Sequence, residues 1–316
     1  MTSDCRPIIV VSETLSERAL GILAERAEVR RTAPEDVLSV IADADALVVR
    51  TYTQVNDALL DAAPQLKVVG RAGVALENID VDACRQRGVE VVHTPAANTL
   101  AVVDYTLRMI IELNRRFWPM DGPVDADTFH KTRKQAYGRF CADATLGIVG
   151  CGRIGSRVGR AAAGLGMRVL YNDILDIDVD YPAEAVEKDQ LYAESDIVTI
   201  HVPATDLTWK FINAESLATF KPGAQFINAA RGQCVDYDDL AAALADGQLG
   251  GAAVDCHDPE PPPRDYPMFN VLDRNVILTP HVAARVPAAM ENMCDVVEDV
   301  LAVLDGRNPA YPAPRG

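Results

Sequence analysis

The sequence predicts an α/β protein made of two doubly wound domains, each built on a parallel β-sheet. Short apolar runs alternate with helical patterns along the chain, which is the order of a parallel sheet with helical crossovers. The alternation occurs in two separate series, and the second begins with a Gly-x-Gly-x-x-Gly turn at residues 150–155. A chain of 316 residues is long enough to form two well-packed cores.

The first series predicts the first domain. Its apolar runs are typical of strands, and helical patterns lie between and around them. We expect strands at 7–11, 46–50, 67–71 and 89–93, and helices at 15–26, 37–42, 56–62 and 82–87.

The second series predicts a nucleotide-binding domain that is inserted within the first. A long helical pattern over 102–118 precedes it, and we expect this segment to be a hinge helix and a candidate dimer surface. One more helix, 287–304, would return to the first domain. The predicted domains are therefore residues 1–98 with 286–316, and residues 99–285. The strands expected in the second domain are 145–149, 168–172, 197–202, 224–228, 252–254 and 275–278.

The glycine turn indicates a dinucleotide site because a strand precedes it and a small-residue helix follows it. Gly150 permits the tight turn, Gly152 lets the backbone approach a pyrophosphate, and Gly155 lets the helix pack close to the strand. The pyrophosphate would then lie at a helix N-terminus, where unpaired N–H groups favour an anion. Asp173 follows Gly155 by eighteen residues, where a carboxylate binds the ribose of NAD and repels the phosphate of NADP. The sequence therefore predicts NAD, although Arg153 is placed to approach a phosphate.

Charge and composition restrict the partners. Thirty basic against 46 acidic residues give a net charge of −16, which argues against nucleic acid and anionic membranes as partners. No stretch has the apolar length of a membrane span, and the N-terminus lacks a basic segment followed by an apolar one, so we expect a cytoplasmic protein. The seven cysteines are scattered without a Cys-x-x-Cys pair, which predicts neither a disulfide framework nor a metal site.

Several motifs follow one another in order along the chain. They are Gly70-Arg71-Ala72-Gly73-Val74 with Asn78-Ile79-Asp80, the glycine turn, His201-Val202-Pro203, Asn228-Ala229-Ala230-Arg231-Gly232, Asp255 with Glu260-Pro261, and Thr279-Pro280-His281. Together these motifs resemble the D-isomer-specific 2-hydroxyacid dehydrogenases, a family that includes D-lactate, glyoxylate/hydroxypyruvate and 3-phosphoglycerate dehydrogenases. The resemblance covers nearly the whole chain. It implies reversible reduction of a 2-keto acid, a small anionic substrate bound between a flavodoxin-like substrate domain and a Rossmann NAD-binding domain, and a homodimer joined through the nucleotide-binding domains.

Three residues have the side chains that such a reduction requires. Arg231 suits a carboxylate because its guanidinium forks across two oxygens. His281 suits proton transfer because imidazole titrates near neutral pH, and Glu260 would favour the imidazolium by about 1 to 3 pKa units. Each of the three taken alone is also compatible with a surface turn, a solvated loop or a structural histidine. Together they follow strands of the second series, and the carboxyl ends of such strands are where open α/β sheets bind ligands.

The resemblance implies further binding residues. Asp255 would receive the nicotinamide amide, and the backbone of Ala72 to Ala75 would hold the substrate carboxylate opposite Arg231. Arg50 would face the substrate or else be a plain strand-end arginine. The cofactor set implied by the motifs is Gly150, Gly152, Arg153, Ile154, Gly155, Asp173, His201, Val202, Pro203, Ala229 and Asp255, and the substrate set is Arg50, Ala72, Gly73, Val74, Ala75 and Arg285.

Departures from the family pattern concern the substrate. His257 stands where an aromatic apolar residue is common, and Arg285 stands where small or hydroxylated residues usually follow the histidine. We hypothesise that Arg285 recognises an additional anionic group, such as a distal carboxylate, phosphate or phosphonate. The alternative is an arginine that faces solvent or bridges the domains.

The same motifs are also compatible with proteins of other activities. Glu260 argues against a formate dehydrogenase, which would have Gln there. A phosphite dehydrogenase and an NAD-sensing binding protein of the corepressor type both share the arginine, glutamate and histidine, so they remain alternatives. The sequence does not name the keto acid or the physiological direction.

Overall fold

A computed structural model of the chain describes residues 6–314 and forms two compact units. Unit 1 consists of Met1–Asn98 with Arg285–Gly316, and unit 2 consists of Thr99–Ala284. Arg285 therefore groups with unit 1, one residue earlier than the boundary expected from the sequence. Residues 1–5, which include Cys5, and residues 315–316 lie outside the described part of the chain.

Unit 1 contains a five-stranded parallel sheet in the order β2-β1-β3-β4-β5. The sequence did not predict β2, because three of its four residues, Glu-Val-Arg-Arg, are charged and it lies at the edge of the sheet. The other four strands coincide with the predicted ones. The strands are β1 (Ile8–Val11), β2 (Glu28–Arg31), β3 (Ala46–Val49), β4 (Val68–Arg71) and β5 (Glu90–His93).

Helices cover both faces of this sheet, and a separate hydrophobic core lies on each face. Helix α11 packs so closely on β4 that a Cβ on Gly70 would lie 2.4 Å from Val300 Cγ2. The segment expected as a helix at 37–42 is instead a 3₁₀-helix, η1, and the helix expected at 287–304 is two helices. The elements are α1 (Glu17–Arg26), η1 (Pro34–Ser39), α2 (Asp57–Ala62), α3 (Val81–Gln86), α10 (Pro287–Met293) and α11 (Val296–Leu304).

Unit 2 contains a seven-stranded parallel sheet in the order β12-β11-β10-β9-β6-β7-β8. The chain reverses its direction of strand addition between β6 and β9, which are adjacent in the sheet. Together the two parallel sheets confirm the predicted fold class. The strands are β6 (Thr145–Val149), β7 (Arg168–Asn172), β8 (Glu184–Ala185), β9 (Ile197–Ile200), β10 (Ala224–Asn228), β11 (Leu249–Val254) and β12 (Val276–Leu278).

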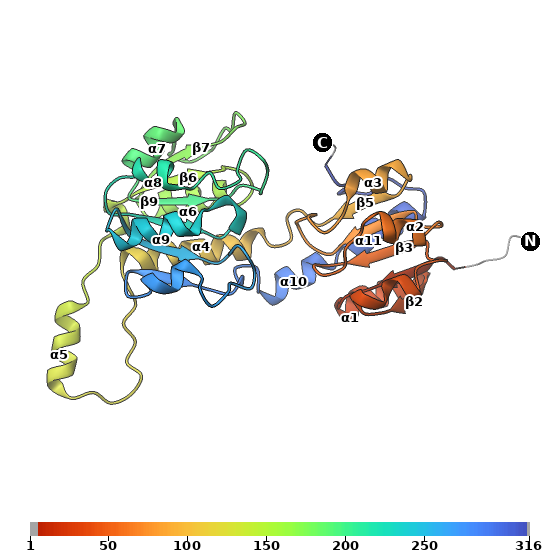
Figure 1. The fold of residues 1–316 in the computed structure, drawn as a ribbon, viewed down its shortest axis with the longest axis horizontal. Helices are drawn as coiled ribbons and strands as arrows, with labels where there is room; N and C mark the ends of the chain where they lie inside the picture. Colours follow the sequence, from red (N-terminus) through yellow and green to blue (C-terminus); the bar gives the residue numbers. More distant parts are fainter. Residues whose placement is uncertain (1–5, 315–316) are drawn as a thin grey trace, which may run out of the picture. The chain divides into compact units, whose positions relative to one another are not determined.

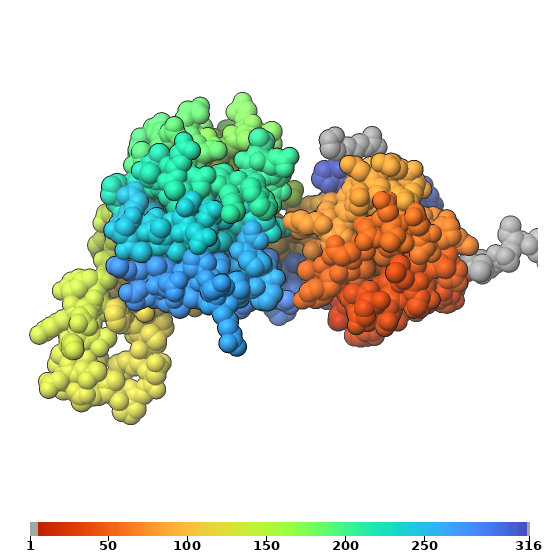
Figure 2. All heavy atoms as spheres, viewed as in Figure 1, coloured from red at the N-terminus to blue at the C-terminus, as the bar shows by residue number. Residues whose placement is uncertain are grey.

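The helices of unit 2 include one long helix against the sheet and one on an extended arm. Helix α4 packs on α6, β10 and β11, and it ends at Asn114, earlier than the pattern predicted. The following segment, residues 115–143, forms an arm that carries α5 and extends away from the rest of unit 2 (Figures 1 and 2). The elements are α4 (Thr99–Asn114), α5 (Ala126–Gln135), η2 (Cys141–Asp143), α6 (Gly155–Gly164), α7 (Lys188–Glu194), α8 (Ala214–Ala218), η3 (Gly232–Cys234), α9 (Tyr237–Ala245) and η4 (Pro267–Val271).

No helix among the described residues is both long enough and apolar enough to cross a membrane.

Candidate active site

The glycine turn connects β6 to α6 and is shaped by its three glycines. Gly150 adopts a φ of 92°, a left-handed conformation that glycine takes readily. A Cβ on Gly155 would lie 2.1 Å from the carbonyl oxygen of Gly150, so only glycine permits this close packing of helix against turn. A Cβ on Gly152, in contrast, would meet no atom within 4 Å, which leaves open space beside its backbone.

This turn fits the pyrophosphate of a dinucleotide. Helix α6 begins at Gly155, and the residue before it, Ile154, makes no side-chain capping bond with the described residues. The N–H groups of Ser156 and Arg157 donate to the carbonyl oxygens of Gly152 and Ile154, each at 3.0 Å, so an anion would be bound by the N–H groups that precede them, where the positive end of the helix dipole favours it. Arg153 is exposed beside the turn, and its carbonyl oxygen accepts a hydrogen bond from Arg157 Nη1 at 2.6 Å.

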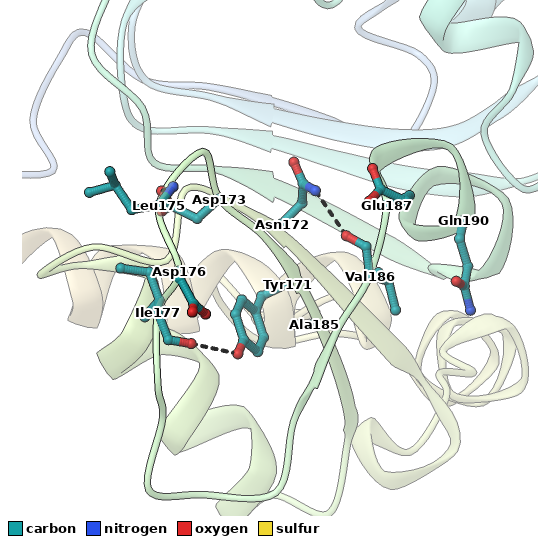
Figure 3. Close-up of a pocket in the computed structure, with 10 residues that line it drawn as sticks. All are labelled: Tyr171, Asn172, Asp173, Leu175, Asp176, Ile177, Ala185, Val186, Glu187 and Gln190. Carbon is teal, nitrogen blue, oxygen red and sulfur yellow. Dashed lines mark hydrogen bonds between the residues drawn. The ribbon is translucent and has the colours of Figure 1, made fainter.

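Asp173 follows β7 and lies beside the glycine turn. Its Oδ2 accepts a hydrogen bond from the Cys151 N–H at 2.7 Å, and its Oδ1 accepts one from the Leu175 N–H at 3.0 Å. A carboxylate offers about four acceptor positions, so two remain for ribose hydroxyls. Asp173 also lines a cavity of about 400 Å³ together with two further acids, Asp176 and Glu187 (Figure 3). The surroundings of Asp173 thus carry negative charge and would repel an additional phosphate.

The loop after β9 packs against the glycine turn. A Cβ on Gly150 would lie 2.7 Å from the carbonyl oxygen of His201 and 2.8 Å from Val202 Cγ1. His201 Nε2 lies 3.2 Å from Thr199 Oγ1, whereas its Nδ1 is shielded from solvent without a hydrogen bond to the described residues. Burial lowers the pKa of His201 to about 4, so this imidazole is neutral. The Pro203 carbonyl oxygen accepts a hydrogen bond from Thr208 Oγ1 at 2.6 Å.

Arg231 lies in the turn that follows β10. Asn228 orders this turn, because its side-chain oxygen accepts from the Ala230 N–H at 3.0 Å and its amide nitrogen donates to the Arg231 carbonyl oxygen at 2.9 Å. Arg231 Nη1 donates to the carbonyl oxygen of Ala230 at 2.7 Å. The next residue, Gly232, packs directly on the loop after β11: a Cβ there would lie 1.9 Å from the carbonyl oxygen of His257.

His281 lies in the turn that follows β12, and Asp255 at the end of β11 holds that turn. The fully buried Asp255 carboxylate accepts hydrogen bonds from Thr279 Oγ1 at 2.6 Å and from the N–H groups of Val282 and Ala283, each at 2.8 Å. The His281 N–H donates to the Asp255 carbonyl oxygen at 2.9 Å. Asp255 therefore positions the histidine turn. Its predicted contact with the nicotinamide amide remains a prediction.

Glu260 and His281 form a hydrogen-bonded pair. His281 Nδ1 lies 2.8 Å from Glu260 Oε2, and the His257 N–H donates to Glu260 Oε1 at 2.8 Å. Contact with the Cys256 side chain and the bond to Glu260 raise the pKa of His281 from its ordinary 6.5 to about 10. Partial burial alone would raise the pKa of Glu260, but the bonds from His281 and His257 lower it on balance. The pair is therefore an imidazolium with a carboxylate at neutral pH.

The predicted catalytic residues thus come from adjacent strands of one sheet. Arg231, Glu260 and His281 follow β10, β11 and β12, which are neighbours in unit 2. In addition, Cys256, Glu260 and His281 offer potential metal-ligand atoms that all lie within 4.8 Å of one another. The chemistry that this edge offers is recognition of an anion and transfer of a proton.

Comparison with known proteins identifies the family. The family model described as "D-isomer specific 2-hydroxyacid dehydrogenase, NAD binding domain" matches residues 107–283, more than half of the chain. The chain belongs to this family. The segment of the chain that carries the glycine turn, Arg231, Glu260 and His281 therefore matches the family's NAD-binding domain.

Curated relatives of this chain carry several names. It is 34% identical to the glyoxylate reductase of Thermofilum pendens over 318 residues, which is 96% of this chain and 93% of that protein. It is 35% identical to a D-3-phosphoglycerate dehydrogenase of Synechocystis over 94% of this chain. It spans about half the length of that relative (54%) and of a chloroplastic phosphoglycerate dehydrogenase of Arabidopsis thaliana (49%).

Solved structures of other proteins share the fold of this chain along nearly its whole length. The TT0316 protein of Thermus thermophilus is 33% identical, with a TM-score of 0.85 over 97% of this chain and 100% of that chain. The D-lactate dehydrogenase of Aquifex aeolicus, complexed with NAD and lactic acid, is 26% identical, with a TM-score of 0.80 over 95% of this chain and 96% of that chain.

Two further residues of the NAD-binding domain, Ala229 and His257, are buried in the interior of unit 2. Ala229 is buried in a small cluster with Val102 and Ala283. His257 is 5% exposed; its Nε2 lies 2.9 Å from the Thr279 carbonyl oxygen and its Nδ1 lies 3.1 Å from Tyr266 Oη. Both ring nitrogens of His257 therefore have hydrogen-bond partners within unit 2. These partners in the interior, rather than contact with a substrate, explain why a histidine stands at this position.

The predicted substrate residues Ala72 to Ala75 form the loop after β4 in unit 1. The N–H of Ala72 donates to the Val49 carbonyl oxygen at 2.8 Å, and that of Gly73 donates to the Arg71 carbonyl oxygen at 2.8 Å. The carbonyl oxygen of Val74 accepts from His93 Nδ1 at 2.8 Å. Of the four residues, Val74 and Ala75 therefore remain the candidates for the predicted binding of a carboxylate through backbone N–H groups.

Arg50 and Arg285 lie together in unit 1, on one cavity that also includes Arg31. Sequence reasoning did not find Arg31, because the strand that presents it was not predicted. Tyr105 was also missed; its Oη lies 2.6 Å from Thr279 Oγ1, which extends the hydrogen-bond chain that starts at Asp255. The only sequence signal for these two residues was their position on a helix or at a strand end.

Proposed function

We propose that this dehydrogenase transfers a hydride between NAD and a small 2-keto acid, forming or consuming the D-2-hydroxy acid. The observation that carries the proposal is the Glu260–His281 pair, with 2.8 Å between Oε2 and Nδ1, on the same sheet edge as Arg231. The names of the relatives support the substrate class, because glyoxylate, hydroxypyruvate and 3-phosphoglycerate are all 2-keto or 2-hydroxy acids.

Each residue has a distinct part in this proposal. Arg231 binds the substrate carboxylate through its forked guanidinium and polarises the adjacent carbonyl. His281 uses Nδ1 to bond Glu260, which leaves Nε2–H to give its proton to the carbonyl oxygen as the alkoxide forms. In the oxidation direction the neutral imidazole takes that proton back. NAD, when bound, supplies the hydride in its reduced form and accepts it in its oxidised form.

The cofactor preference follows from the acids beside the glycine turn. Asp173 binds the ribose hydroxyls, and Asp176 and Glu187 add negative charge to the same cavity. A third phosphate on the cofactor would be placed against these carboxylates, so NAD is preferred over NADP.

The proposal includes a homodimer formed through the arm of unit 2. The arm places several large apolar side chains in solvent, where an isolated domain would not keep them. A second copy of this chain would cover them. They are Phe117 (72% exposed), Trp118 (42%), Met120 (64%), Val124 (44%), Phe129 (44%), Tyr137 (85%) and Phe140 (75%).

We further propose a cytoplasmic location. Six described cysteines are free thiols, and five of them are buried, which is typical of proteins from a reducing compartment.

The test is NADH oxidation by the purified protein against glyoxylate, hydroxypyruvate, pyruvate and oxaloacetate, with His281→Ala measured beside it. The expected result is turnover of at least one 2-keto acid and a loss of about 100-fold or more in the variant, because a positioned acid contributes about 10² to 10⁴ in rate. Tight NADH binding without turnover of any keto acid would overturn the proposal. In that case phosphite oxidation or NAD sensing would be the better assignment.

A further inference from the structure

Cys256 places a thiol beside the pair formed by Glu260 and His281. One potential ligand atom from each of these three residues lies within 4.8 Å of the other two. All three residues belong to unit 2, where they lie in the loop after β11 and the turn after β12, two neighbouring strands. No step of the reaction proposed above uses the thiol. Its position therefore requires an explanation of its own.

The three side chains offer one sulfur, one nitrogen and one oxygen atom, a ligand set that suits Zn²⁺. In proteins this ion is bound tetrahedrally by thiolate, imidazole and carboxylate groups, and a site with three protein ligands leaves the fourth position to water. Mg²⁺ and Ca²⁺ instead prefer sites made of oxygen atoms. The ligand set therefore favours Zn²⁺ over these harder cations.

The spacing of the ligand atoms is close to that of a tetrahedral zinc site. Bonds of about 2.0 Å to nitrogen and oxygen and about 2.3 Å to sulfur place the ligand atoms about 3.3 to 3.8 Å apart. Glu260 Oε2 and His281 Nδ1 lie 2.8 Å apart, and the ligand atoms of the cluster all lie within 4.8 Å of one another. Small rotations of the side chains, without movement of the backbone, are enough to adjust these distances.

Hydrogen bonds from neighbouring groups orient the two ligands of the loop after β11. Glu260 Oε1 accepts the His257 N–H at 2.8 Å, so Oε2 is the oxygen that remains for an ion. The carbonyl oxygen of Cys256 accepts a hydrogen bond from Tyr237 Oη. Such outer contacts fix the direction of metal ligands before an ion binds.

The backbone of His281 is held in an uncommon conformation. Its φ of 52° lies in the left-handed region, which residues other than glycine rarely adopt. The His281 N–H donates to the carbonyl oxygens of Asp255 at 2.9 Å and Thr279 at 3.0 Å. Conformations of this kind persist only where the surrounding structure determines them, and they are concentrated at active sites and ligand sites. The local fold therefore fixes the direction of the imidazole.

The cluster is accessible from the side of its acid and its histidine. The side chains of His281 and Glu260 are 47% and 38% exposed, whereas Cys256 is 2% exposed. An ion that enters from solvent meets the carboxylate and the imidazole first and the thiol at the inner end. The Cys256 thiol donates only to the carbonyl oxygen of Ala230, at 3.4 Å, and a thiol is a weak donor. A bond to a metal ion would readily replace this contact.

We propose that Cys256, Glu260 and His281 form a Zn²⁺ site whose occupation stops the reaction. The thiol and the imidazolium each release a proton to solvent as Sγ and a ring nitrogen bond to the ion, and no electrons are transferred. The metal-bound ring then has neither the acidic proton that reduction requires nor the free lone pair that oxidation requires. The loss of activity rests on the proposed function, whereas binding of the ion does not.

The spacing of the cysteines along the chain does not indicate this site, because its ligands follow two different strands. Cys256 and Glu260 are four residues apart in one loop, and His281 follows the next strand of the sheet. Only the fold brings the three side chains together.

The first experiment measures binding to the whole protein without cofactor or substrate. Metal-free protein is titrated with CoCl₂, whose absorption reports tetrahedral geometry and a bond to thiolate, and with ZnCl₂ in a calorimeter. We expect one ion per chain in this site and a thiolate-to-cobalt charge-transfer band. Cys256→Ser should remove the band and weaken Zn²⁺ binding by about 100-fold or more, because changes in the outer contacts of zinc ligands already cost about 10-fold to 100-fold.

Two further variants make the binding experiment specific. Cys256→Ala should give the same result as Cys256→Ser, which excludes an effect of the new hydroxyl group on the loop. Cys141→Ser is the matched control, because Cys141 is partly exposed while the other cysteines of residues 6–314 are buried. The control should bind Zn²⁺ as the parent protein does.

The second experiment measures NADH-dependent reduction of a keto acid, with each variant compared with its own rate without metal. ZnCl₂ should inhibit the parent and Cys141→Ser at equal concentrations, and a chelator should restore their activity. Inhibition of Cys256→Ser should need about 100-fold more ZnCl₂, in line with its weaker binding. MgCl₂ at the concentration that inhibits as ZnCl₂ should leave the rate unchanged.

The two experiments also distinguish the ways in which the proposal can fail. Equally tight Zn²⁺ binding by the parent and both Cys256 variants would overturn it, as would a cobalt spectrum without a thiolate band. Binding through Cys256 that leaves turnover unchanged would overturn the inhibitory role. If no keto acid is turned over at all, the proposed function fails, and the cobalt and zinc titrations alone then decide whether the metal site exists.

Discussion

Glu260 is fixed at both carboxylate oxygens: Oε2 lies 2.8 Å from His281 Nδ1, and Oε1 accepts the His257 N–H at 2.8 Å. A carboxylate held at one oxygen can rotate away from its partner, whereas this one cannot without losing both bonds. The orientation of the imidazole ring is therefore determined by the backbone of the loop after β11. The histidine that we propose as proton donor is thus oriented before any substrate binds.

The first prediction concerns the pH dependence of the reaction. His281 keeps its proton up to a pKa of about 10, so kcat/KM for keto-acid reduction should stay level through neutral pH and fall only as the pH rises through that value. In Glu260→Gln the charged partner is lost, and the fall should move about 1 to 3 pH units lower. For hydroxy-acid oxidation, which needs the neutral imidazole, activity should rise through the same pH range.

The measurement is the pH profile of kcat/KM in both directions. Glu215→Gln, a change at an exposed position in the first turn of α8, is the control and should not move the profile. A Glu260→Gln profile that coincides with that of the parent would show that Glu260 does not set the protonation of His281.

The second prediction concerns cofactor choice. Replacing Asp173 by Asn removes the charge while keeping the size of the side chain, and the hydrogen bonds to ribose should weaken by about 1.5 to 3 kcal/mol. We expect KM for NADH to rise about 10-fold to 100-fold, and the ratio of NADPH to NADH activity to rise. Asp176→Asn, in the same cavity but without a bond to the glycine turn, should change this ratio much less. Efficient use of NADPH by the unaltered protein would contradict our interpretation of Asp173.

The third prediction concerns the contact between the Arg231 turn and the loop after β11. A Cβ at residue 232 would lie 1.9 Å from the His257 carbonyl oxygen, so Gly232→Ala should destabilise unit 2 by about 1 to 3 kcal/mol. A drop in Tm of about 2 to 12 °C is expected, measured by calorimetry. Gly164→Ala is the matched control, because a Cβ there meets nothing within 4 Å. Equal Tm values for the two variants would refute the steric argument.

The fourth prediction concerns assembly. Phe117 and Phe140 are 72% and 75% exposed on the arm, and replacing both by Ser should shift the protein from dimer to monomer in sedimentation velocity. Leu207→Ser, at a residue that is 78% exposed outside the arm, should leave the dimer intact. A monomeric parent protein would mean that the arm serves another purpose.

Sequence reasoning found the residues whose signal is local. The glycine turn, Arg231 and His281 each lie directly after an apolar strand, and parallel strands end at one edge, so their grouping followed from the order of the elements. The same reasoning missed Arg31, because the polar residues of β2 do not alternate as a half-buried strand does.

Contacts between distant residues were beyond the sequence. The approach of Cys256 to His281 joins two strands, and the four backbone bonds to Glu13 depend on the conformation of a loop 37 to 40 residues further along the chain. We expected His257 to affect substrate choice, but its two ring nitrogens have hydrogen-bond partners in the interior of unit 2. Periodicity reports which face of an element is buried, but it does not report what that face meets.

The close approach of Gly232 to the His257 carbonyl has a consequence for motion. Because two backbones touch there without a side chain between them, the Arg231 turn and the loop after β11 cannot slide past each other. Thermal fluctuations should displace Arg231 and Glu260 together, and the bond to His281 extends this coupling to a third turn. The spacing between the three side chains would then stay constant while their surroundings rearrange during turnover.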